Sequence, residues 1–282
     1  MTPNQTWMWV GATSTGIRHL KKNEACQDSA TAFEVRISDD DSAFIAIVSD
    51  GAGSTKFGGI GSAITCRTFA RLAKDYLLSG QTISSLSDEL VKEWVEVTRY
   101  RISKAAKTRE SKMREFAATL VMAIVGENDT CFIQIGDGAC VFKTKCNGHF
   151  GVPIVPMHGE YASSTYFITD MNTVRFERVI VNEAVQQIAV LTDGIEKLAI
   201  LPDRMSADEE FFHSLFQPFE NFQSNGRNRE FSKFLRSWLA SEAICERTDD
   251  DKSLILAQRS DRKLRPAVSN VDSKSSEAKP KD

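Results

Sequence analysis

An apolar run followed directly by Asp-Gly occurs three times in this chain, and this repetition limits the folds available to it. The runs IAIVS, FIQIG and IAVLT lead into Asp50, Asp137 and Asp193. Short apolar runs bounded by turn residues are typical of buried β-strands, and a glycine after each aspartate permits a sharp turn. We therefore expect buried sheets with carboxylates at the ends of strands that are distant in sequence.

A fourth acidic segment, Asp249–Asp251, directly precedes the apolar run SLILA. A lone Asp-Gly is most often a plain turn, but carboxylates from several strand ends form the oxygen-rich site that a hard divalent cation requires. Without a cluster of thiolates or imidazoles, Mg²⁺ or Mn²⁺ is favoured over a softer metal. The chain also lacks a GxxxxGK[ST] or kinase lysine motif, which favours metal-assisted hydrolysis over nucleotide-driven transfer.

Hydrophobic periodicity predicts strands grouped together and helices grouped together, without regular βαβ alternation. Two antiparallel helices are expected, one through Phe69–Leu77 and one from Leu86 to about Lys107, and later helices at Asp208–Phe216 and Asn228–Leu239. The expected strands are Trp7–Ala12, Ala30–Ile37, Ala43–Val48, 117–125, 130–136, 139–145, Thr165–Ile168, Val174–Val181, Ile188–Thr192 and Ser253–Ala257. This pattern predicts an α+β fold rather than a Rossmann-type one.

The charge balance excludes several classes of partner. The 282 residues carry a formal net charge of −3, which argues against nucleic acid or an anionic membrane as the main partner. No signal-peptide pattern opens the chain, and the longest apolar run, Ala117–Val125, is too short for a bilayer span of about 20 residues. We therefore expect a cytoplasmic protein. Its six cysteines lack CxxC or zinc spacing and are expected to be reduced, mostly buried thiols.

The composition changes near residue 259. Residues 259–282 contain seven basic and four acidic side chains and no aromatic residue, too little apolar surface to offset the entropy of ordering. We expect one domain over 1–258 and a disordered polar tail over 259–282, although the excess of basic residues leaves an interaction tail as an alternative.

The order of short motifs along the chain resembles the PP2C-type (PPM) metal-dependent serine/threonine protein phosphatases, most closely a bacterial branch. The motifs, spread over about residues 8–257, are CQDSA at 26–30, IVSDGAGS at 47–54, ATLV at 118–121, IGDGACV at 135–141, GEYASSTYFIT at 159–169, LTDGI at 191–195 and TDDDKSLILA at 248–257. The resemblance implies a four-layer αββα sandwich, in which two antiparallel sheets are flanked by helical pairs.

The resemblance also implies the metal ligands. Asp50 would bridge two Mn²⁺ or Mg²⁺ ions, and the carbonyl of Gly51 would bind one of them. Asp193 and Asp250 would hold the other ion, Asp250 being chosen over its two neighbours because the family pattern is Asp, a polar residue, any residue and then Ser or Thr. Two further residues complete the implied set: Asp28, acting mainly through water, and Asp137, pairing with Asp193 at a weaker third metal.

Two positions depart from the family pattern. Many members carry an arginine five residues before the first-motif aspartate, where this chain has Asn23, and many eukaryotic members carry a histidine where this chain has Ala52. Neither role can be transferred. In the similar bacterial branch a histidine precedes the CQD aspartate by nine residues, which is His19 here. His19 is therefore assigned to phosphate contact or leaving-group protonation, and the nearby cationic candidates are Arg18, Lys21 and Lys22. A solvent-exposed basic loop is the alternative for RHLKK.

The function implied is hydrolysis of phosphoserine or phosphothreonine in proteins, by a water that bridges two metal ions. Asp50, Asp193 and His19 are the expected catalytic residues, and the substrate would be a phosphoprotein produced by a Ser/Thr kinase. A monomer is expected. A cysteine-based phosphatase is disfavoured because the phosphate loop of backbone amides and arginine is missing. A catalytically weak or dead PP2C-like module that binds phosphoproteins is the main alternative, and a small-molecule phosphoesterase is a weaker one.

Overall fold

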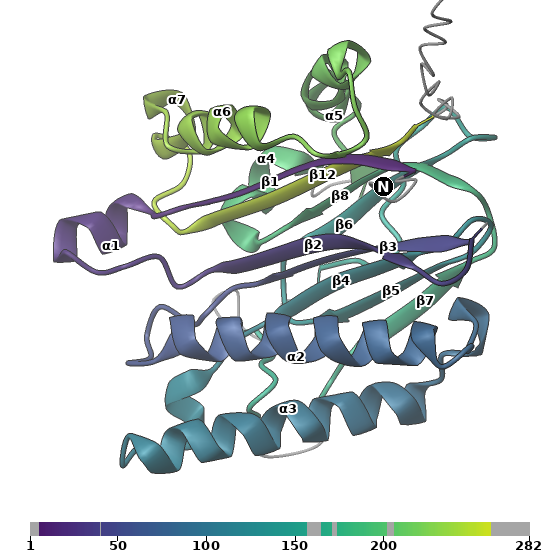
Figure 1. Ribbon diagram of the computed structural model, residues 1–282. Coiled ribbons are helices and arrows are strands. Elements are labelled where there is room, and N and C mark those ends of the chain that lie inside the picture. The colour runs from purple at the N-terminus through teal and green to yellow at the C-terminus, as the bar shows by residue number, and fades with distance from the viewer. Residues whose placement is uncertain (1–5, 40, 157–164, 171–173, 202–205, 261–282) are drawn as a thin grey trace, which may run out of the picture.

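The strands form two five-stranded sheets that pack face to face (Figure 1). The computed structural model describes residues 6–39, 41–156, 165–170, 174–201 and 206–260. Sheet A has the order β11-β1-β12-β8-β6, and sheet B has the order β2-β3-β4-β5-β7. All pairings are antiparallel except that of β1 with β11. The strands are β1 Trp7–Ser14, β2 Ser29–Arg36, β3 Ser42–Ser49, β4 Leu120–Val125, β5 Thr130–Ile135, β6 Ala139–Thr144, β7 Glu177–Val181, β8 Val185–Leu191, β11 Gly226–Arg227 and β12 Lys252–Arg259.

Helices cover the outer face of each sheet (Figure 1). The long antiparallel pair α2 (Gly58–Leu78) and α3 (Asp88–Thr108) lies against sheet B. Helices on the other side cover sheet A, and short 3₁₀ turns and a two-strand pairing lie between the larger elements. These remaining elements are α1 Ile17–Lys22, η1 Ile83–Ser85, η2 Met113–Phe116, α4 Asp193–Ala199, β9 Ile200–Leu201, β10 Ser206–Ala207, α5 Glu209–Phe216, η3 Gln217–Asn221, α6 Arg229–Leu239 and α7 Glu242–Cys245.

The hydrophobic core has three parts that match the layers. One part lies between sheet B and the α2–α3 pair, one between sheet A and the helices α4 to α6, and one between the two sheets. In the central part the rings of Trp7 and Phe44 stack with centroids 5.2 Å apart, which joins β1 of sheet A to β3 of sheet B. The expected α+β, four-layer αββα arrangement is confirmed.

Several predicted elements differ from the structure. The strand predicted at Thr165–Ile168 is wrong: residues 168–169 form a turn, in which the Ile168 amide donates to the Ala118 carbonyl at 3.0 Å. Ile168 is buried by packing rather than by pairing in a sheet. The strand predicted at Val174–Val181 begins only at Glu177, and the helix predicted from Phe69 begins at Gly58. The sequence prediction also missed α1.

The last strand extends past the predicted domain boundary. β12 includes Arg259, which pairs with Trp7, and the Ser260 amide donates to the Thr6 carbonyl at 2.7 Å. The expected tail therefore starts later than residue 259, and residues 261–282 lie outside the described residues, as does the first part of the GEYASSTYFIT segment. None of the helices in the described ranges has the length and apolar character of a membrane span.

Candidate active site

Five aspartates from four distant parts of the chain line one cavity of about 820 Å³, and the fifth, Asp249, is adjacent to Asp250. Asp50 follows β3, Asp137 lies in the turn between β5 and β6, Asp193 begins α4 after β8, and Asp250 precedes β12. Each is therefore placed by the end of a buried strand, and the two sheets bring these ends together. The prediction that strand-end carboxylates converge is met for these four residues.

The fifth predicted ligand, Asp28, is buried directly behind this cavity. Only 8% of Asp28 is exposed, and its Oδ2 accepts a hydrogen bond from the Thr192 hydroxyl at 2.8 Å. It is not among the residues that line the cavity. Thr192 also accepts a hydrogen bond from the Ser253 amide at 2.9 Å, so one hydroxyl connects Asp28 to the starts of α4 and β12.

The backbone around Gly51 leaves no room for a side chain. A Cβ atom at this position would lie 2.3 Å from the carbonyl carbon of Gly58, far inside van der Waals contact. Gly51 also forms an isolated β-bridge with Ala118. The close approach to Gly58 requires glycine and holds the backbone of residue 51 next to Asp50, where the resemblance places a carbonyl ligand.

The carboxyl groups of the site raise one another's pKa values. Burial raises the pKa of Asp50 well above its ordinary value, and the neighbouring Asp28 and Asp193 raise it further. Burial likewise raises the pKa of Asp193, and the like charges of Asp137 and Asp250 raise it further. Burial also raises the pKa of Asp28 to about 6. A cluster of this kind is costly unless protons or cations neutralise it.

The donor set fits a hard divalent cation. Oδ1 of Asp28 and Oδ1 of Asp193 are buried and have no hydrogen-bond partner in the structure, and all the candidate ligands are oxygens. Within the described ranges, no group of three or more Asp, Glu, His or Cys side chains is placed so that it could hold a metal ion by itself. Mg²⁺ sites usually combine one or two carboxylates with several waters, so a cage built from side chains alone is not required.

Asp250 and Asp251 have different roles, although they are adjacent. Asp250 lines the cavity, and its Oδ1 accepts a hydrogen bond from the Arg18 guanidinium at 2.6 Å. Asp251 is only 1% exposed, and both of its oxygens accept hydrogen bonds from protein groups. Asp251 therefore has little capacity left for a metal, which supports Asp250 as the ligand.

The RHLKK segment is a short helix rather than the exposed loop considered above. Arg18 and Lys22 line the cavity, and Lys21 is exposed outside it. His19 is only 2% exposed, its Nδ1 lies 2.9 Å from Asp251 Oδ2, and it is not among the lining residues. The structure thus places Arg18 and Lys22 in the wall of the cavity, and it places Lys21 and His19 outside that lining.

Sequence reasoning missed other residues that face the cavity. Glu196 lines it, and its Oε2 accepts a hydrogen bond from the Gly138 amide at 2.9 Å, which holds the turn that carries Asp137. Lys197 and Arg247 add positive charge to the same wall. The position of Glu196, three residues after Asp193 and within the first turn of α4, was the available signal. The contact between α4 and the Gly138 turn could not be inferred from spacing.

The pKa of Asp28 predicts how the metal-free protein responds to pH. In EDTA we expect a higher melting temperature at about pH 5.5 than at about pH 7.5. The folded chain binds the proton of the Asp28 carboxyl more tightly than the unfolded chain does. The stabilisation of the fold by this proton is therefore full below the ordinary pKa of 3.8 and is lost as the pH rises through about 6. If the effect is worth about 1 kcal/mol, it shifts the melting temperature by about 2–4 °C. An Asp28→Asn control should reduce the difference, and a wild type that melts higher at pH 7.5 would contradict the assignment.

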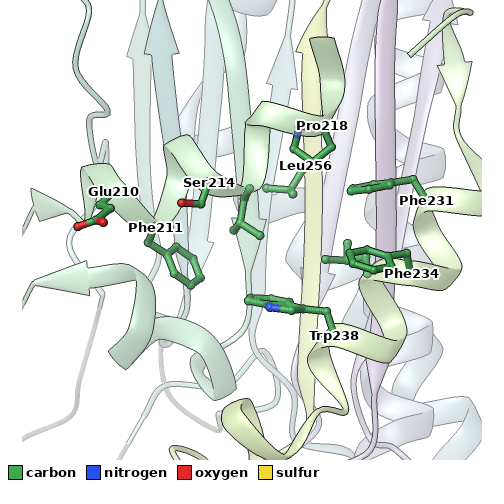
Figure 2. Close-up of a pocket in the computed structure, with 10 residues that line it drawn as sticks. Glu210, Phe211, Ser214, Pro218, Phe231, Phe234, Trp238 and Leu256 are labelled. Carbon is green, nitrogen blue, oxygen red and sulfur yellow. The ribbon is translucent and has the colours of Figure 1, made fainter. Parts of the chain in front are cut away.

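A second cavity of about 290 Å³ is apolar and has a different chemistry. It lies between α5 and α6 above β12, where Phe211, Trp238 and Phe234 surround the space over Leu256 (Figure 2). Glu210 is its only titratable lining residue. This groove therefore lacks the groups that hydrolysis would need.

Comparisons with known proteins agree with this geometry. The sequence model of the family described as Protein phosphatase 2C matches residues 15–240. Serine/threonine-protein phosphatase 3 of Escherichia coli K12 is 32% identical over 257 residues, covering 89% of this chain and 98% of that protein.

Two solved structures share the fold. The phosphatase Stp1 of Staphylococcus aureus has a TM-score of 0.59 at 13% identity and covers 89% of this chain and 94% of its own. The catalytic domain of the phosphatase PstP, solved in complex with two manganese ions, has a TM-score of 0.59 at 12% identity and covers 89% and 97%. The family match, the relative and the cavity lined by strand-end aspartates agree, and the chain belongs to the protein phosphatase 2C family.

Proposed function

We propose that this protein is a metal-dependent phosphatase of phosphoserine and phosphothreonine in proteins. The observation that carries the proposal is the cavity of about 820 Å³, which is lined by five aspartates from four separate strand ends. Clustered carboxylates whose pKa values are raised mark a place where positive charge is needed. The names of the relative and of both structural neighbours support this reaction.

Asp50, Asp137, Asp193 and Asp250 line the cavity, and Asp28 and Gly51 are proposed ligands outside that lining. Asp50 lies close enough to both Asp193 and Asp250 for their charges to raise its pKa, as a ligand of the ion that those two residues would hold should. Asp193 and Asp250 would hold one Mn²⁺ or Mg²⁺, the Gly51 carbonyl would hold the other, and Asp28 would act through water. Asp137, next to Asp193, would serve a third ion. The ions, when bound, supply activation of water and neutralisation of phosphoryl charge.

The chain itself contributes the binding of the phosphate. Arg18, Lys22 and Lys197 line the cavity beside the aspartates. They would provide the positive charge that many family members obtain from an arginine at the position of Asn23. Arg18 is held by Asp250 at 2.6 Å, so its guanidinium is already directed to the edge of the metal site. A planar guanidinium can bind two phosphoryl oxygens at once.

The substrate would be a phosphorylated protein rather than a small metabolite. The cavity opens beside a further hollow of about 680 Å³, and the two share Gly53 and Ser54, so room for flanking peptide residues adjoins the acidic centre. A Ser/Thr kinase would supply the phosphoprotein. We expect the enzyme to act as a cytoplasmic monomer.

A direct test is hydrolysis of phosphoserine and phosphothreonine peptides and of p-nitrophenyl phosphate with Mn²⁺. We expect turnover that EDTA abolishes, that added Mn²⁺ restores and that okadaic acid leaves unchanged. A folded wild type that binds Mn²⁺ but hydrolyses none of these substrates would contradict the proposal. It would favour the phosphoprotein-binding module instead.

Truncation after Ser260 tests the proposed domain boundary. The body is closed by β12 and by the hydrogen bond between Ser260 and Thr6, and residues 261–282 carry little apolar surface. We expect unchanged turnover of p-nitrophenyl phosphate. A loss of more than about tenfold, roughly 1.4 kcal/mol in the barrier, would show that these residues contribute to the active body.

A further inference from the structure

Asp251 and His19 are buried and do not line the cavity. The sequence motifs assigned no shared role to these two residues. We propose that Asp251 and His19 form a positioning pair that fixes the candidate ligands Asp28 and Asp250 relative to each other, so that His19 acts through Asp251 and not on the phosphate. This inference rests on the proposed function.

Three segments meet at the carboxylate of Asp251. Its Oδ1 accepts the Gly16 amide at 2.7 Å, and its Oδ2 accepts the Gln27 amide at 2.5 Å. The same Oδ2 lies 2.9 Å from Nδ1 of His19. Gln27 precedes Asp28, and Asp251 follows Asp250. One side chain therefore sets the distance between the segment that carries Asp28 and the strand that carries Asp250.

The backbone around Asp251 is packed as tightly as its side chain. A Cβ on Gly16 would lie 2.3 Å from the carbonyl carbon of Asp250, and a Cβ on Gly194 would lie 1.9 Å from the carbonyl oxygen of Asp251. Gly194 follows Asp193, so the start of α4 is fixed against the same point. A displacement of Asp251 would therefore also displace Asp28, Asp193 and Asp250.

The hydrogen bonds require a carboxylate at position 251. One backbone N–H group donates to Oδ1 and another donates to Oδ2. A backbone N–H can only donate a hydrogen bond, so both oxygens must accept. An asparagine would place its NH₂ against the Gly16 amide in one orientation and against the Gln27 amide in the other. Either orientation leaves two buried donors facing each other, which is costly.

The position of His19 fits an indirect role. Its ring is 2% exposed, and Nδ1 donates to Asp251 when the proton is on that nitrogen. Nε2 is buried without a hydrogen-bond partner and lies 3.9 Å from Glu24 Oε2. A general acid must reach the leaving oxygen through one of its nitrogens, and His19 is not among the residues that line the cavity.

Two substitutions of His19 separate the two roles. In His19→Asn the side-chain amide takes the place of Nδ1 and can still donate to Asp251, whereas in His19→Gln it reaches toward the place of Nε2. We expect His19→Asn to bind Mn²⁺ within about threefold of wild type by calorimetry. His19→Gln should bind about 10–100-fold more weakly, the usual cost of losing a group that orients a metal ligand.

Turnover provides the second readout. We expect His19→Asn to hydrolyse a phosphoserine peptide and p-nitrophenyl phosphate in the wild-type ratio, because leaving-group protonation is not its task. The opposite result, in which His19→Gln retains activity and His19→Asn loses the alkyl phosphate selectively, would show that Nε2 acts on the substrate. That result would overturn the inference.

Asp251→Asn tests the other member of the pair, with Asp39→Asn as a matched control. Asp39 is an exposed aspartate that pairs only with Arg36 among the described residues, so its replacement removes the same charge far from these hydrogen bonds. We expect Asp251→Asn to weaken Mn²⁺ binding at least about tenfold and Asp39→Asn to leave it unchanged. If Asp251→Asn fails to fold, the two His19 variants still decide.

The outcomes also separate this inference from the proposed function. One outcome would overturn the positioning pair alone. In it the wild type binds Mn²⁺ and turns over substrate, and Asp251→Asn and His19→Gln bind Mn²⁺ as tightly as the wild type. A wild type that binds no Mn²⁺ would overturn both.

Discussion

Asp50→Asn is expected to lower turnover of phosphopeptides by at least about a thousandfold, roughly 4 kcal/mol in the barrier, while the protein stays folded. Asp50 lies at the end of β3 and lines the cavity, and its amide is held by the Thr119 hydroxyl at 3.0 Å. The substitution keeps the shape of the side chain but removes the charge that two ions would share. Steady-state kinetics at saturating Mn²⁺ measures the effect.

The same variant should gain stability when metal is absent. Burial, Asp28 and Asp193 all raise the pKa of Asp50, so its ionised form destabilises the folded chain at neutral pH. We expect Asp50→Asn in EDTA at about pH 7.5 to melt above the wild type. Opposite changes in activity and stability are typical of a site residue. Near-normal turnover, or equal melting with the Asp39→Asn control, would contradict the assignment.

Gly194→Ala is the second change for which we expect a large effect. The new Cβ would lie 1.9 Å from the carbonyl oxygen of Asp251, which belongs to rigid backbone. Either α4 or the start of β12 must move, and such overpacking costs about 1–3 kcal/mol, occasionally more. We expect the melting temperature to fall by about 6–12 °C at the upper cost, and Mn²⁺ affinity to fall with it.

Gly148→Ala is the matched control for this prediction. A Cβ at Gly148 would meet nothing within 4 Å, and its φ is not in the left-handed region. We expect its melting temperature to differ from the wild type by less than about 2 °C, within the usual effect of surface substitutions. Equal melting of the two alanine variants would show that β12 and α4 are not held together as described.

The sequence predicted the layers and the strand-end aspartates well, because both follow from local patterns. Apolar runs next to Asp-Gly indicate buried strands, and such a strand can be predicted without knowing which other strand it pairs with. Segments whose structure depends on tertiary contacts were predicted less well. The start of α2 carries three glycines, Gly58, Gly59 and Gly61, which disfavour a helix. Yet a Cβ at Gly61 would lie 2.0 Å from the Phe116 carbonyl oxygen, so close packing requires glycine there.

The same limit applies to the site. The role of Asp251 depends on amides at positions 16 and 27, more than 220 residues away along the chain, and no spacing rule connects them. His19 was assigned by resemblance to direct chemistry, and its burial became visible only in the fold. Glu196 was missed because its hydrogen bond with Gly138 joins helix α4 to the β5–β6 turn, and the two residues are 58 positions apart in the sequence.

The place of β12 in sheet A affects how the protein is made. This strand lies between β1 and β8, so the strand that is synthesised after the other four of sheet A fills the centre of the sheet and directly follows Asp250. Sheet A cannot close, and the aspartates that line the cavity cannot come together, until residue 259 has left the ribosome. Pairing between strands this far apart in sequence is slow to form. A nascent or prematurely terminated chain would therefore be inactive toward the phosphoproteins around it, and synthesis itself would set the moment at which the enzyme becomes active.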